Sequence, residues 1–116
     1  MKKIYVGLIK GRHDMPVDEF IFDQVVNPCD FNAIKRVAND FVVSRCNVTK
    51  SYQVAINQAD STEVECFTSD VELNVYVTGL TACTAAIIQV CALNGVNLVL
   101  HHFNSASGEY VKQVIF

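Results

Sequence analysis

The sequence lacks the cysteine patterns of small metal-binding or disulfide-stabilised proteins. It contains five cysteines, an odd number, and no two of them form a C-x-x-C pair. This arrangement suggests neither a zinc site nor a closed disulfide framework. We therefore expect free and mostly buried thiols, as in a protein of the reducing cytoplasm.

Positive charge is also scarce. Nine lysines and arginines stand against twelve acidic residues, which leaves a net charge of −3. This balance disfavours binding to a long nucleic-acid strand, because such a partner requires many positive charges. A small anionic ligand needs far fewer cations. The first apolar run ends at Lys10, which is too short for a signal peptide or a membrane span. We expect a cytoplasmic protein that does not bind membranes.

Apolar side chains are what the sequence has in excess. Of its 116 residues 51% are hydrophobic and 18% are charged, with no repeat, linker or low-complexity segment. We therefore take residues 1–116 as a single α/β domain. A chain this apolar either covers its sheet on both faces or hides surface in an oligomer. We expect a homodimer or a higher homo-oligomer, supported by the apolar stretch at 111–116.

Hydrophobic periodicity predicts a mixed sheet of about six strands with two main helices. Extended segments are expected at 2–9, 17–26, 71–77, 96–103 and 109–116, and a hairpin with one exposed face at 51–66. The alternation over 2–9 suits a strand buried on both sides. The order strand, helix, strand over 71–103 predicts a Rossmann-like crossover unit with parallel strands.

Two helices are marked by their ends. Asp30 is the expected N-cap of the first, and Gly95 is the expected C-terminal stop of the second, which begins near Thr81. One face of the first helix is expected to be apolar and to consist of Phe31, Ile34, Val37, Ala38, Phe41 and Val42.

The turn Thr78-Gly79-Leu80-Thr81 joins the strand at 71–77 to the second helix. One interpretation is a plain turn in which Thr81 caps the helix, since every helix start must satisfy its N–H groups. The other is an anion site, in which free N–H groups, the helix dipole and two hydroxyls meet a phosphate and Gly79 allows close approach. Both interpretations stay open.

Further polar residues follow other strands of the predicted sheet. If the first strand is parallel to the crossover pair, Lys10, Arg12 and His13 share the carboxyl edge of the sheet with this turn, and Asn104 follows the strand at 96–103. Ligands collect at that edge in open sheets. Lys10 and Arg12 are therefore candidate phosphate-binding residues.

His101 and His102 are neighbours on a strand, so their side chains point to opposite faces. One of them, or His13, is a candidate general acid or base, and the other is a candidate structural histidine. No carboxylate lies at ligand spacing from either, so we expect no preformed metal site, and a single metal shared across a subunit interface stays an open alternative. We expect no cofactor.

The segment LNVYVTGLTACTAAIIQVCALNGVNLVLHHFNSASGEYVKQVIF, residues 73–116, resembles the small CRISPR-associated proteins with a Rossmann-like (CARF-like) nucleotide-sensing core, including compact ring nucleases. Shared features are the strand ending in a glycine-containing turn, the short helix with small residues, the apolar strand and the terminal Gly-Glu-Tyr. The resemblance implies a cyclic oligonucleotide or related nucleotide second messenger, bound by Thr78, Gly79, Leu80 and Thr81 with Lys10 or Arg12. It also implies a homodimer or higher oligomer.

Three functions follow. The first is binding of such an immune messenger, to sense it or to sequester it, including as a phage anti-defence protein in the host cytoplasm. The second is its cleavage by a ring nuclease or other phosphodiesterase. The third is a structural, partner-binding oligomer. Because the sequence has no convincing nucleophile or metal cluster, binding is favoured over cleavage.

Overall fold

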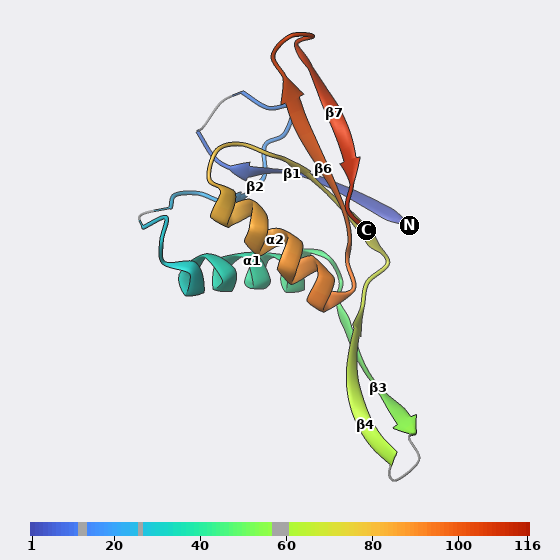
Figure 1. Ribbon diagram of the computed structural model, residues 1–116. Helices are drawn as coiled ribbons and strands as arrows, with labels where there is room; N and C mark the ends of the chain where they lie inside the picture. The colour runs from blue at the N-terminus through green and yellow to red at the C-terminus, as the bar shows by residue number, and fades with distance from the viewer. Residues whose placement is uncertain (12–13, 26, 57–60) are drawn as a thin grey trace.

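The computed structural model describes residues 1–11, 14–25, 27–56 and 61–116, and it has the α/β architecture expected from the sequence (Figure 1). The elements follow in the order β1 (Lys2–Ile9), β2 (Phe20–Phe22), α1 (Phe31–Arg45), β3 (Thr49–Ile56), β4 (Ser61–Thr68), β5 (Val71–Tyr76), α2 (Thr81–Asn94), β6 (Asn97–Asn104) and β7 (Glu109–Val114). None of the described helices is long and apolar enough to cross a membrane.

The main sheet has five strands in the order β2-β1-β5-β6-β7. β1 is parallel to both of its neighbours, β5 is parallel to β6, and β7 returns antiparallel to β6. Val75 lies in register between Val6 of β1 and Leu100 of β6. The parallel pairing of β1 with β5 is the condition on which the predicted edge site depended.

The core lies between one face of this sheet and the two helices (Figure 1). Strands bury alternate residues, and the apolar sets from the three central strands are Ile4, Val6 and Leu8, then Val71, Leu73 and Val75, then Leu98 and Leu100. The prediction that the first strand is buried on both sides is only partly right. Ile9 is buried, but Tyr5 on the face away from the helices is 43% exposed.

α1 begins as the sequence predicted. Oδ1 of Asp30 accepts a hydrogen bond of 3.1 Å from the N–H of Ala33, the usual N-cap contact. The expected apolar face is narrower in the structure, where Ile34, Ala38 and Val42 are buried and Phe41 is half-buried. The two remaining members of that face, Phe31 and Val37, stay exposed at the surface.

The two ends of α2 differ in how well they were predicted. Gly95 ends the helix in the left-handed conformation with φ 65°, as expected. The prediction that Thr81 caps the start is wrong. Leu80 occupies the N-cap position without a side-chain hydrogen bond, and Thr81 is the first helical residue.

The chain does not form one sheet of about six strands. β3 and β4 pair with each other as a separate antiparallel sheet, which extends away from the rest of the molecule (Figure 1). Neither of its faces is buried along its described length: Tyr52 and Val54 are exposed on one face and Val64 on the other. Only Phe20–Phe22 of the expected segment 17–26 pairs as a strand, and Val26 lies outside the described residues.

Candidate functional site

The carboxyl edge of the main sheet brings together residues from distant parts of the chain. Lys10 follows β1, and the turn 78–80 follows β5. Because the two strands are parallel, both segments lie at this edge. The N–H of Lys10 donates to the carbonyl oxygen of Phe22 at 2.9 Å, which holds Lys10 beside the end of β2. Arg12 and His13 lie outside the described residues.

The start of α2 leaves backbone donors unused. The N–H groups of Cys83 and Thr84 both reach the carbonyl of Leu80, at 3.1 and 3.4 Å. Within the described part of the chain no acceptor meets the N–H of Thr81 or of Ala82, and the N-cap residue contributes no side chain. These donors lie at the positive end of the helix dipole, where anions are stabilised.

Thr78, the first residue of the turn, carries a buried hydroxyl with no partner in the described part of the chain. The residue is 8% exposed, and its Oγ1 atom makes no hydrogen bond with any of the described residues. An unsatisfied buried hydroxyl costs about 1–3 kcal/mol, so most buried polar groups in proteins are paired. Gly79 follows with φ 50°, a backbone conformation that favours glycine. The turn therefore holds an uncompensated polar group next to free backbone donors.

A lysine of α1, Lys35, approaches the start of α2. Lys35 and Phe31 of α1 line a hollow of about 420 Å³ together with Ala82, the second residue of α2. Asn32 and Gln89 add amide groups to the same hollow. The sequence offered no signal for this contact, because it depends on how α1 packs against α2. Lys35 therefore lines the same hollow as the second residue of α2.

His101 occupies a different environment, on the sheet face away from the helices. Its Nε2 atom lies 2.9 Å from Oδ1 of Asn74, and its ring stacks on Tyr76 with centroids 4.7 Å apart. Tyr5 lies 6.1 Å from the same ring, and Tyr110 meets Tyr76 edge to face at 4.8 Å. Burial is the largest cause that lowers the pKa of His101, so the ring is neutral at pH 7. His101 is a satisfied structural histidine, one of the two roles weighed for the pair.

The other polar residues of β6 point elsewhere. His102 is exposed on the opposite face, with Nε2 2.7 Å from Oε1 of Gln113. Asn104 closes the β6–β7 turn by accepting from the N–H of Ala106. His101 is the partner of Tyr76, the last residue of β5. Asn104 lies three residues after His101, which is about 10 Å along β6. Asn104 therefore lies at the far end of β6, and its contact with a ligand stays a prediction.

The chemistry available at the edge is that of an anion site. In the described part of the chain, no three His, Cys, Asp or Glu side chains gather closely enough to hold a metal ion. Comparisons of the chain with known proteins gave no match to a family model, a curated protein or a solved structure. What the edge offers is two free N–H groups, a buried hydroxyl and Lys10, and Lys35 lines the neighbouring hollow; all of these are donors suited to phosphate.

Proposed function

We propose that the protein binds a small nucleotide-type ligand, a cyclic oligonucleotide or related immune second messenger, at the edge formed by Lys10 and the turn Thr78–Thr81. The unpaired buried hydroxyl of Thr78, beside two free N–H groups at the start of α2, carries this proposal. A phosphate oxygen would accept from all three donors, while Lys10 and Lys35 supply positive charge. The resemblance of residues 73–116 to nucleotide-sensing proteins points to the same ligand class.

Binding rather than cleavage is the activity proposed. Of the three candidate acid–base residues, His101 is engaged with Asn74 and His102 with Gln113. A protein that holds its ligand intact either senses the signal or removes it from circulation, as an anti-defence protein of a phage would. Chromatography after heating the complex separates the activities: recovered intact ligand supports binding, and linear products identify a phosphodiesterase.

Calorimetric titration with cyclic di-, tri- and tetranucleotides and with ADP-ribose derivatives tests the proposal directly. We expect at least one of them to bind, and binding to weaken about tenfold in Gly79→Ala and in the isosteric Thr78→Val. Gly108→Ala is a matched control, because Gly108 also has positive φ (72°) but lies in the β6–β7 turn. The proposal is overturned if no ligand of the panel binds, or if both turn variants bind as tightly as the control.

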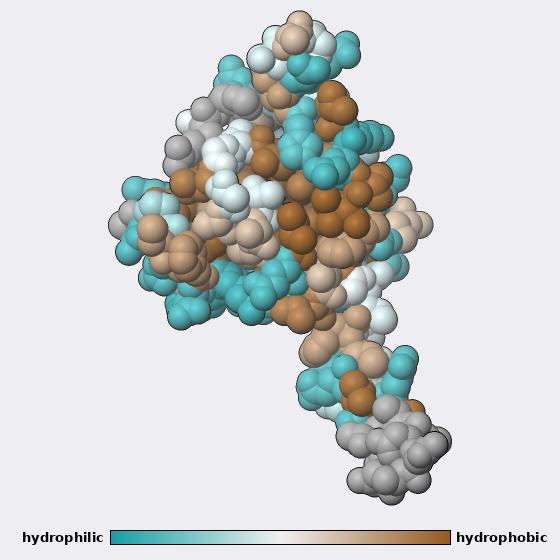
Figure 2. Space-filling view, viewed as in Figure 1, coloured by the Kyte–Doolittle hydropathy of each residue, from teal (hydrophilic) through white to brown (hydrophobic). Residues whose placement is uncertain are grey.

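We also propose that the protein acts as a homodimer joined through β7. Val111 and Val114 on this strand are 53% and 71% exposed, and among the described strands only β6 pairs with it. Figure 2 shows hydrophobic residues gathered over the part of the surface where β6 and β7 lie. A second copy of β7, related by a two-fold axis, would pair antiparallel with the first and cover this edge.

Light scattering measures the dimer. The wild type is expected to have twice the mass of one chain. The Val114→Lys variant is expected to have the mass of a single chain. Val64→Lys, an equally drastic change at an exposed position of β4, is the control and is expected to leave the mass unchanged. A monomeric wild type would refute the dimer.

A further inference from the structure

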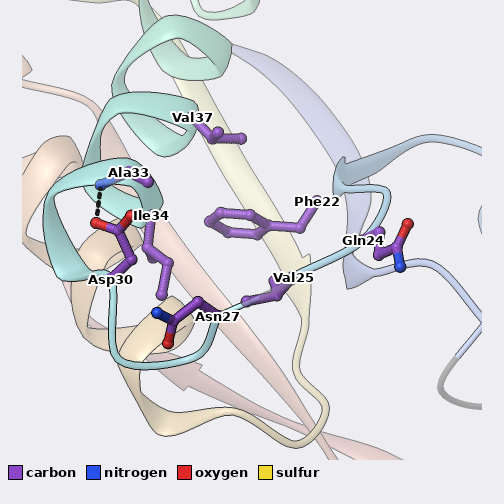
Figure 3. A pocket seen from close by; sticks show the side chains of 8 residues that line it. All are labelled: Phe22, Gln24, Val25, Asn27, Asp30, Ala33, Ile34 and Val37. Atoms are coloured by element: carbon purple, nitrogen blue, oxygen red, sulfur yellow. Dashed lines mark hydrogen bonds between the residues drawn. The ribbon is translucent and has the colours of Figure 1, made fainter.

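A pocket of about 330 Å³ opens beside the first turns of α1, at the carboxyl end of β2 (Figure 3). Five apolar residues and three polar ones line it: Phe22, Val25, Ala33, Ile34 and Val37, and Gln24, Asn27 and Asp30. Figure 3 shows the ring of Phe22 directed toward α1, between the levels of Ile34 and Val37. The volume lies in the range of small-molecule sites, which are mostly apolar with a few polar groups.

We propose that this pocket receives the nucleoside part of the ligand, with its base against the apolar walls and its phosphate outside. The inference rests on the proposed function, because it assigns the rest of a ligand whose phosphate is held at the Thr78–Thr81 turn. The pocket and the sheet edge are connected through the backbone of Phe22 and Lys10. Phe22 lines the pocket, and its carbonyl accepts from the N–H of Lys10, the first cation of the edge.

The far side of α1 gives a second link. Phe31, the first residue of that helix, lines the hollow that also contains Ala82 of α2. Asp30, the residue before it, lines the pocket beneath Phe22. The start of α1 therefore contributes residues both to the pocket and to the hollow that Ala82 lines.

An amide side chain at the rim, that of Asn27, suits the polar edge of a base. Oδ1 of Asn27 accepts from the N–H of Cys29 at 3.0 Å, and its Nδ2 has no partner in the described part of the chain. Gln24 also lines the pocket, but Figure 3 shows its amide pointing away from α1, so Asn27 is the amide placed to meet a base. Asn and Gln recognise bases through such donor–acceptor pairs.

Asp30 determines which part of a nucleotide the pocket accepts. Its Oδ1 atom is used by the N–H of Ala33, and in the described residues Oδ2 makes no other bond, so it can accept from a ribose hydroxyl. No lysine or arginine is among the described residues that line the pocket. A phosphate inside would be repelled by this carboxylate, so the charged end of the ligand lies outside, toward Lys10.

The probes for this inference are AMP, GMP, CMP and UMP, with inorganic pyrophosphate as the phosphate-only reference. Val37→Phe fills the mouth of the pocket from a position that is already 43% exposed, so the helix tolerates it. Val43→Phe, at an exposed position of the same helix outside the pocket, is the matched control. We expect at least one nucleotide to bind the wild type and the control about tenfold more tightly than Val37→Phe, with pyrophosphate binding equal in all three.

The outcomes separate this inference from the proposed function. Nucleotide binding that is weakened by Gly79→Ala but unchanged by Val37→Phe overturns the pocket assignment alone. Failure of both pyrophosphate and nucleotides to bind the wild type overturns both. A change in the preference among the four bases in Asn27→Ala would support contact of that amide with the base, and an unchanged preference would contradict it.

Discussion

Nε2 of His101 and Oδ1 of Asn74 meet at 2.9 Å across the neighbouring strands β6 and β5. The other end of the Asn74 amide, Nδ2, donates to Oε2 of Glu72 at 3.1 Å, which sets the orientation of the amide. Oδ1 is then an acceptor only, so His101 carries its hydrogen on Nε2. The pair is buried, and the neutral ring is the form that this environment favours.

The first prediction concerns the pH dependence of stability. Burial lowers the pKa of His101 in the folded protein, so below about pH 6.5 the unfolded chain binds a proton that the folded one resists. The free energy of unfolding therefore falls as the pH decreases from about 6.5 toward the lowered pKa, at most by about 1.4 kcal/mol per pH unit.

Urea unfolding between pH 5 and 8 measures this dependence. His101→Gln removes the titrating group while retaining an amide donor for Asn74, so its stability should vary less with pH over this range. His102→Gln, the exposed neighbour, is the control and should follow the wild type. Equal pH dependence in all three proteins would show that His101 is not the group responsible.

The second prediction concerns the bond between Glu19 and Arg45, which ties the approach to β2 to the end of α1. Nε and an Nη atom of Arg45 donate to the two carboxylate oxygens of Glu19, at 2.6 and 2.7 Å. The hydrogen bond from Arg45 is the largest cause that lowers the pKa of Glu19. The contribution of the Glu19–Arg45 bond to stability is therefore present above about pH 4.3. It is lost as the pH falls through the lowered pKa of Glu19.

A double-mutant cycle with Glu19→Gln and Arg45→Lys measures the coupling. Both side chains are 41% exposed, so solvent screens the pair and we expect about 0.5–1 kcal/mol at low salt. The coupling should shrink in 1 M salt. A coupling free energy of zero at low salt would contradict the prediction.

The third prediction concerns Gly95, where α2 ends against the hairpin. Its φ is positive, and an added Cβ would collide with the backbone carbonyl oxygen of Phe67 in β4. Gly95→Ala should lower the free energy of unfolding by about 2–3 kcal/mol, since backbone strain and a backbone clash act together. Gly11→Ala is the control, because Gly11 also has positive φ but open space around it, and it should cost about 1 kcal/mol. Equal losses in the two variants would exclude the contact with β4 as the cause.

The fourth prediction concerns Thr78. Thr78→Val replaces an unpaired buried hydroxyl by a methyl group of similar size, so the ligand-free protein should become more stable by about 1 kcal/mol. Thermal or urea unfolding measures the change without any ligand. A loss of stability would mean that the hydroxyl has a partner in solution, which would remove the main support for an anion at the turn.

The fifth prediction concerns the cysteines, none of which forms a disulfide. Burial raises the pKa of the Cys46 thiol to about 11 and that of Cys91 to about 12, so both stay protonated and unreactive at pH 8. Iodoacetamide labelling followed by mass spectrometry should modify exposed Cys29 first and half-buried Cys66 next. Cys46, Cys83 and Cys91 should react only after unfolding, and early labelling of any of them would contradict the buried core.

Local signals in the sequence were sufficient for most of the elements. The alternation over 2–9 predicted β1, Asp30 predicted the start of α1, and Gly95 predicted the end of α2, because period, capping and left-handed backbone depend on a few adjacent residues. The same reasoning failed at Thr81, since threonine is a common cap and only the backbone conformation decides that Leu80 takes that position.

Other features depend on distant contacts. The alternation of residues in the hairpin predicted its pairing but not its separation from the main sheet, which follows from the absence of a buried face along its described length. The pattern of α1 also did not reveal that Phe31 and Val37 line two surface cavities, because both look like core residues in sequence.

The sequence by itself determined the α/β class, the strand–helix–strand order of the C-terminal half and the identity of the turn that begins α2. Only the tertiary structure decided that Lys10 shares an edge with that turn, that Lys35 approaches it, and that His101 is buried against Asn74. The physical reason is that strand direction, strand register and helix packing are set by the burial of side chains from the whole chain. A local pattern specifies which face of an element is apolar, and the partner of that face is known only once the core has formed.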